Sequence, residues 1–233
     1  MDSFDPGEFF TFVVCAVISV FGAYRWFRAL IKVRPRPGSA PVRLALWLLP
    51  ISLLLLLQIV LSRWADPVVR SSRFYDLLFL FGGGAWVSGT VFLMPWFGVD
   101  VRIDAMEQGN AASAIAACGA LTGTMICYAG SNIGQGDSIA TTFIPAIGAT
   151  GLFALLWMLV TAMTPVAVTI AIERQTAAGV RLAIYLTIIG SVIGRACAGN
   201  WISLENTIHD LFVMSWSAAL ATIVFILQER MIR

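Results

Sequence analysis

Charged side chains are scarce in this chain. They make up 12% of its 233 residues, and the formal net charge is only +2. No polar stretch is long enough to form a separate soluble domain, so any chemistry must take place among apolar segments or on short loops. The basic residues gather in short groups rather than covering one face. This distribution argues against nucleic acid as a partner.

Side chains that bind metals or cofactors are also few. His209 is the only histidine and Lys32 the only lysine, and no two cysteines have the C-x-x-C spacing. One imidazole without paired cysteines cannot supply a bis-histidine haem site, a zinc site or a Cys/His nucleophile pair. Lys32 lies at the exit of the first apolar segment, where it cannot form the Schiff base of a retinal protein. We therefore expect no cofactor, no metal and no catalytic residues.

The cysteines all lie inside or at the ends of apolar segments. Buried cysteine usually acts as a small apolar side chain, and we expect that role here rather than a disulfide. The residues concerned are Cys15, Cys118, Cys127 and Cys197.

Apolar residues are abundant: they form 59% of the chain, with a mean hydropathy of +0.86. A helix needs roughly 20 apolar residues to cross the hydrocarbon core, and in lipid each segment must satisfy its own backbone hydrogen bonds. The pattern predicts an all-α integral membrane protein, a bundle of about seven transmembrane helices. The predicted spans are 9–30, 42–61, 76–96, 110–128, 139–172, 180–198 and 211–227. Pro145 and Pro165 are expected to interrupt the fifth, and residues 203–210 form a polar lead-in to the seventh.

The segments group into three parts. Residues 1–75 hold two helices, 76–202 a four-helix core rich in small residues, and 203–233 the last helix with a short tail. The first ten residues carry acidic but no basic side chains, so we expect the first helix to be retained rather than cleaved as a signal peptide.

Basic residues between the first two spans predict the orientation. By the positive-inside rule this connector lies in the cytoplasm and the N-terminus outside, in a bacterial inner membrane, with anionic lipid headgroups as the partners of its side chains. The connector residues are Arg25, Arg28, Lys32, Arg34, Arg36 and Arg43. Arg63, Arg70 and Arg73 fall on the outer side and count against this orientation.

Small residues four apart mark two of the core helices. The pairs are Gly119 with Gly123 and Gly190 with Gly194. Such pairs let two helix backbones approach closely, either inside one chain or between subunits. The motif Glu-x-x-Asn-Ala-Ala at 107–112 is echoed by Glu-x-x-Thr-Ala-Ala at 173–178, as in a parallel repeat.

The stretch Asp-Ala-Met-Glu-Gln-Gly-Asn-Ala-Ala-Ser-Ala-Ile-Ala at 104–116, followed by Gly119, resembles the YjfL-like family. Residues 173–201 resemble a later helix of the same family, so the likeness covers roughly the third to sixth helices. In the family pattern the first acidic residue falls on Asp104, and Glu107 is an extra carboxylate. The resemblance implies a small bacterial inner-membrane protein with a four-helix core and no established reaction.

Polar residues near the ends of the spans are the candidates for an ion or proton pathway. An outer group would contain Arg195, Glu205, His209 and Asp210, where a histidine beside carboxylates can titrate near neutral pH. The alternative is an interfacial salt-bridge cluster. An inner group would contain Asp104, Glu107, Asn110 and Glu173. These residues either cap helices or form an acidic ring in an oligomer.

These observations predict a non-enzymatic membrane component that oligomerises or packs in an envelope complex, with a small ion channel as one form. Two alternatives stay open: a proton- or cation-coupled transporter that uses the polar groups above, and an accessory subunit of a larger membrane complex.

Overall fold

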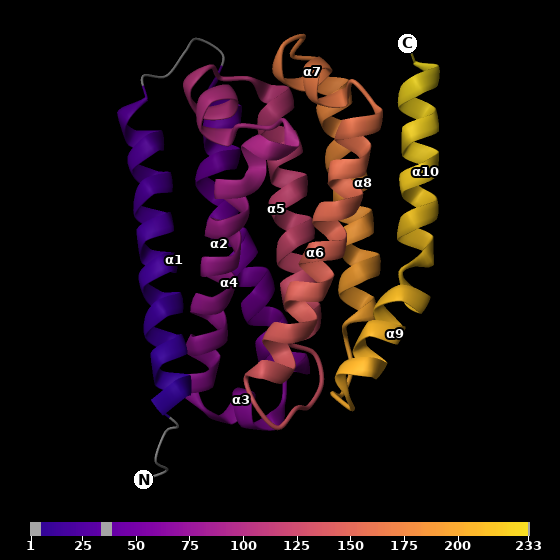
Figure 1. Cartoon of the computed structure of the whole chain (residues 1–233). Helices are drawn as coiled ribbons and strands as arrows, with labels where there is room; N and C mark the ends of the chain where they lie inside the picture. Colours follow the sequence, from indigo (N-terminus) through magenta and orange to yellow (C-terminus); the bar gives the residue numbers. More distant parts are fainter. Residues whose placement is uncertain (1–5, 34–38, 233) are drawn as a thin grey trace.

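The computed structural model describes residues 6–33 and 39–232 and forms a bundle of long helices (Figure 1). Seven helical segments are long and apolar enough to cross a membrane, which confirms the predicted all-α membrane bundle. They comprise α1 (Pro6–Lys32), α2 (Ala40–Trp64), α4 (Arg73–Leu93) extended by η1 (Met94–Phe97), α5 (Ala111–Ser131), α6 (Ala140–Met163), α8 (Thr176–Ala196), and α9 (Leu204–Met214) with α10 (Trp216–Met231). No strand occurs in the described ranges.

Three short elements join the spans: α3 (Pro67–Ser71), the π-helix η2 (Val101–Glu107) and α7 (Val166–Ala171). The predicted fifth span is in fact α6 and α7, separated at Thr164 and Pro165. Pro145 lies within α6, which continues through it as one helix. The predicted polar lead-in is helical as well, because 204–214 form α9.

The last span is broken at Ser215 between α9 and α10. The Ser215 hydroxyl is buried and has no hydrogen-bond partner among the described residues. Figure 1 shows α9 tilted away from the line of α10.

The odd number of spans puts the two ends of the chain on opposite faces of the bundle (Figure 1). The face that carries the N-terminus also holds α3, the α5–α6 loop and α9. The opposite face holds η2, α7 and the end of α10.

The central helix is α5, whose side chains are buried on nearly every side. It lies parallel to α8 in direct backbone contact. A methyl group added at Gly190 would lie 2.5 Å from the Cα of Gly123, and one added at Gly194 would lie 2.7 Å from the carbonyl oxygen of Ile126. The two glycine pairs therefore serve packing within the chain, at the centre of the fold.

The entries to α5 and α8 have the same local geometry. Both helices are 21 residues long, and each follows a short helix. The cap residues Asn110 and Gln175 have φ/ψ of −73/108° and −73/104°. Each comes after a residue in the left-handed region, Gly109 at φ 65° and Arg174 at φ 56°. This match agrees with a parallel repeat in which Asn110 corresponds to Gln175. The sequence echo differs by one residue, because it pairs Asn110 with Thr176.

The first helix is attached at the edge of the bundle. It packs on α4 through small residues: a methyl group at Gly22 would meet Ser88, and one at Gly84 would meet Ser19. Trp26 Nε1 donates to the carbonyl oxygen of Leu46 in α2 at 3.0 Å. Most of the outward side chains of α1 are apolar and exposed, as expected for a lipid-facing helix.

Candidate functional site

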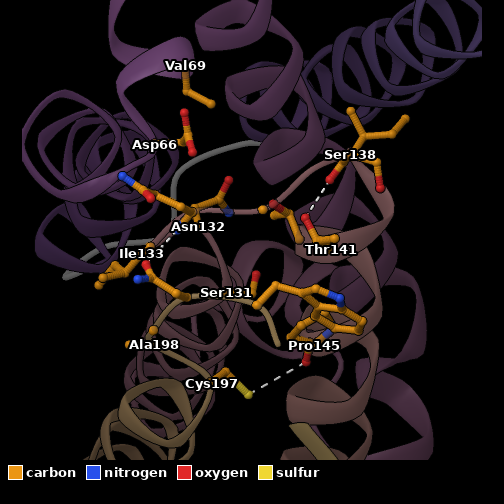
Figure 2. Close-up of a pocket in the computed structure, with 18 of the residues that line it drawn as sticks. Asp66, Val69, Ser131, Asn132, Ile133, Ser138, Thr141, Pro145, Cys197 and Ala198 are labelled. Atoms are coloured by element: carbon orange, nitrogen blue, oxygen red, sulfur yellow. Dashed lines mark hydrogen bonds between the residues drawn. The ribbon is translucent and has the colours of Figure 1, made fainter. Parts of the chain in front are cut away.

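A pocket of about 420 Å³ opens at the end of the bundle that carries the N-terminus. Its walls come from the start of α1, the α2–α3 turn, the α5–α6 loop, the start of α6 and the α8–α9 connection. In Figure 2, Asp66 and Asn132 lie on one side of the pocket, Ser138 and Thr141 on another, and Cys197 and Pro145 at one end. A volume in this range suits a small-molecule ligand.

Two loops that form the pocket are joined by backbone hydrogen bonds. Gly199 N donates to Ile133 O at 2.9 Å, and Trp201 N donates to Gln135 O at 2.8 Å. Gln135 N in turn donates to the Asn200 side chain at 2.9 Å. Gly134 and Gly199 have φ values of 114° and 152°, which side-chain-bearing residues rarely adopt. These contacts hold both loops in place, so the pocket has a preformed wall.

Of the lining residues that the structure describes, four carry carboxylates and none is Lys, Arg or His. The carboxylates belong to Glu8, Asp66, Asp137 and Asp210. Tyr75 donates to Glu8 Oε2 at 2.7 Å, and Val68 N donates to Asp66 Oδ1 at 2.7 Å. These contacts fix the first two carboxylates through one oxygen each.

Asn132 is the most buried polar side chain of the pocket wall, with 5% of its surface exposed. Its Nδ2 donates to the carbonyl oxygen of Tyr128 at 2.8 Å. Within the described ranges no hydrogen bond to its Oδ1 is found. Tyr128 itself is fully buried, and its hydroxyl donates to Phe79 O at 3.0 Å. The pocket thus contains a fixed amide group with acceptor capacity to spare.

Cys197 also lines the pocket, and its thiol contacts the carbonyl oxygen of Pro145 at 3.7 Å. Burial raises the pKa of this thiol to about 11, which keeps it protonated and poorly nucleophilic.

The predicted outer group is only partly assembled. His209 Nδ1 lies 3.4 Å from Asp210 Oδ1, and both side chains are exposed. The Arg195 guanidinium donates instead to the carbonyl oxygen of Ala198 at 3.4 Å. In the described part of the chain no ion pair joins Arg195 to Glu205, His209 or Asp210. Of the four predicted residues, Asp210 alone lines the pocket.

The predicted inner group is also divided among separate contacts. Glu107 pairs with Arg102 at 3.2 Å, while Glu173 accepts from Gln175 Nε2 at 2.8 Å. Asp104 Oδ2 accepts from the Asp100 backbone at 3.1 Å. These three carboxylates make no contact with one another in the described structure.

Asn110 has the capping role. Its Oδ1 accepts from the backbone N–H groups of Ala112 and Ser113, and its Nδ2 donates to Ile170 O at 2.8 Å. The amide therefore caps α5 and ties that helix to α7. The acidic residues before α5 do not cap it, because an Asn at the cap position itself satisfies the free N–H groups.

Asp104 lies in η2, outside the spans, and partial burial raises its carboxyl pKa above 3.8. The Asp104 carboxyl therefore binds a proton more readily in the native state than in the unfolded state. The resulting stabilisation is complete below about pH 3.8 and is lost as pH rises through the native pKa. We expect Asp104→Asn to remove this loss of stability at higher pH, because the amide is neutral and its oxygen can still accept the hydrogen bond from the Asp100 backbone N–H. The unfolding temperature of the variant relative to the wild type, measured from about pH 3 to 7, should rise with pH; a constant difference would contradict the prediction.

An ion pair buried between two spans was not predicted. Arg181 in α8 donates through Nε and Nη2 to the Glu229 carboxylate in α10, at 2.5 and 3.1 Å. Glu229 is 4% exposed. One turn further along α8, Tyr185 shares a 2.7 Å hydrogen bond with Thr222. Neither residue was among the predicted site residues, although a carboxylate within an apolar helix is the signal that would have revealed the pair.

These features define a multi-pass helical membrane protein with a polar pocket at one end. No family model, curated protein or solved structure matches the chain. The resemblance of 104–116 to the YjfL-like family therefore stays a prediction.

Proposed function

We propose that this chain is a non-enzymatic membrane protein that binds a small polar solute in the pocket between α5–α6 and α8–α9. The single observation that carries the proposal is the preformed 420 Å³ pocket, whose wall is held by backbone hydrogen bonds between two loops. The pocket also lies at the junction of α5 and α8, the helices that the repeat relates.

The charge distribution supports a pocket that faces away from the cytoplasm. Most basic side chains lie at the opposite end of the bundle, which the positive-inside rule assigns to the cytoplasm. Among the described residues these are Arg25, Arg28, Lys32, Arg43, Arg102, Arg174, Arg181 and Arg230. The pocket end carries Arg63, Arg70, Arg73 and Arg195. We propose a bacterial inner membrane as the location.

Oligomerisation, ion conduction and transport stay predictions. The glycine pairs that suggested subunit contacts are occupied within the chain, so they no longer argue for an oligomer.

The test is a thermal unfolding assay of the full chain in lipid nanodiscs, with a matched set of solutes. The set is trans-1,4-cyclohexanediamine, the corresponding diol and the corresponding dicarboxylate. A ligand that binds only the native state raises the unfolding temperature. We expect at least one solute to do so in the wild type, and to lose the effect in Thr142→Trp, which fills the pocket.

Ser138→Trp supplies a second blocking variant, because Ser138 is exposed in the loop and its replacement leaves the packing intact. Ile147→Trp in α6 is the control, because Ile147 is 61% exposed and lies outside the pocket lining, and this variant should bind like the wild type. A wild type that responds to none of the solutes, or blocking variants that respond as the wild type does, would contradict the proposed function.

A further inference from the structure

The lining of the pocket has one sign of charge. Among the described residues, the charged side chains of the lining are the carboxylates of Glu8, Asp66, Asp137 and Asp210, and none is basic. The basic residues at the same end, such as Arg195, point to other partners or lie outside the lining. An anionic solute would meet four carboxylates without a compensating cation, so the lining disfavours it.

Among the neutral polar groups of the lining, the Asn132 side chain adds a fixed acceptor. The Asn132 amide is 5% exposed and lines the pocket, its Nδ2 is used by Tyr128 O, and its Oδ1 has no hydrogen bond within the described ranges. This oxygen is accessible from the pocket, so an N–H group of a ligand can donate to it. The pocket therefore favours a ligand that carries several N–H groups.

A bare metal ion does not fit this arrangement. Among residues 6–33 and 39–232, no three His, Cys, Asp or Glu side chains are grouped closely enough to hold a metal ion. The carboxylates are instead spread around a volume of about 420 Å³, which has room for a molecule of several heavy atoms. An ammonium group has three donors and no acceptor, and so matches carboxylates and an amide oxygen.

We infer that the pocket selects a small organic cation that carries at least one ammonium group. This inference rests on the proposed function and adds the chemical class of its ligand. The amine would place its N–H donors on the Asn132 carbonyl and on carboxylates of the lining, as charge-assisted hydrogen bonds.

The same nanodisc preparation tests the ligand class by isothermal titration with the diamine, the diol and the dicarboxylate. We expect the diamine to bind at least tenfold more tightly than either relative. Neutralising two carboxylates, in Asp137→Asn with Asp210→Asn, should weaken the diamine about tenfold and leave any binding of the diol unchanged. Asp100→Asn, at the opposite end of the bundle, removes a carboxylate away from the pocket and should bind the diamine as the wild type does.

The two proposals fail in different ways. If the diol or the dicarboxylate binds more tightly than the diamine, and Ser138→Trp abolishes that binding, the pocket is a binding site but its ligand is not an amine. Equal weakening of the diamine by Asp100→Asn and by the pocket variant would also overturn the amine class, because a general effect of charge would then explain the binding. Absence of binding by all of these solutes would overturn both proposals.

Discussion

Gly190→Ala is expected to destabilise the protein by about 3 kcal/mol or more, although it adds only one methyl group. That methyl group would lie 2.5 to 2.9 Å from three backbone atoms of Gly123: Cα, the carbonyl oxygen and the carbonyl carbon. A backbone cannot move aside as a flexible side chain can, so α5 and α8 must separate. Separation would weaken every contact along the central helix pair.

Gly151→Ala in α6 is the matched control. Apart from the adjoining turns of α6 itself, no described residue comes within 4 Å of a methyl group at that position. Alanine also favours a helix over glycine by roughly 0.5 to 1 kcal/mol. Thermal unfolding in nanodiscs and gel filtration in detergent should show a large loss for the α8 variant and no loss for the α6 variant. Similar behaviour of the two variants would mean that the close approach of α5 and α8 does not support the fold.

Glu229→Ala is expected to cost about 3 to 5 kcal/mol, because it leaves the Arg181 guanidinium between two spans without its partner. Replacing both members, with Arg181→Met and Glu229→Leu, should restore most of the stability. An apolar pair of similar volume avoids both the unpaired charge and the cost of desolvating the ion pair. Unfolding temperatures of the single and double variants in nanodiscs measure the difference.

The exposed pair of Arg102 and Glu107 provides the comparison, since its side chains are 67% and 44% accessible. Glu107→Ala should change stability by about 1 kcal/mol or less. The interpretation of Arg181 and Glu229 as a buried pair would be wrong if Glu229→Ala were equally mild, or if the double variant were less stable than the single one.

The spans could be predicted from the sequence because each one is a continuous apolar segment of roughly 20 residues, which can be recognised without knowing the fold. Apolar runs place α1, α2 and α5 within a few residues of their observed bounds. Proline was a less certain guide: Pro165 follows the end of α6, whereas Pro145 lies within that helix. The identity of the residue alone does not show whether a proline will follow the end of a helix or lie inside one.

The pocket was much harder to predict, because loops and helix ends that lie far apart in the sequence form its lining. Asn132 and Asp137 belong to a loop that the sequence identifies only as a turn between helices, and Glu8 lies about 120 residues earlier. Asp210 was among the predicted site residues, but it was grouped with Arg195 rather than with distant carboxylates. Closeness in sequence suggested the wrong neighbours, since the fold brings together the ends of several spans.

The position of α5 has a consequence for biosynthesis. Its glycine surface is complementary to α8, yet α8 begins at Thr176, 65 residues after α5 begins at Ala111. At elongation rates of roughly 5 to 20 residues per second, α5 leaves the ribosome several seconds before its main partner exists. During that interval its small-residue surface has only earlier helices, lipid or the insertion machinery to cover it. The order of translation thus delays the packing of α5, the most buried helix. The bundle can be completed only after α8 and the helices that follow it have been synthesised.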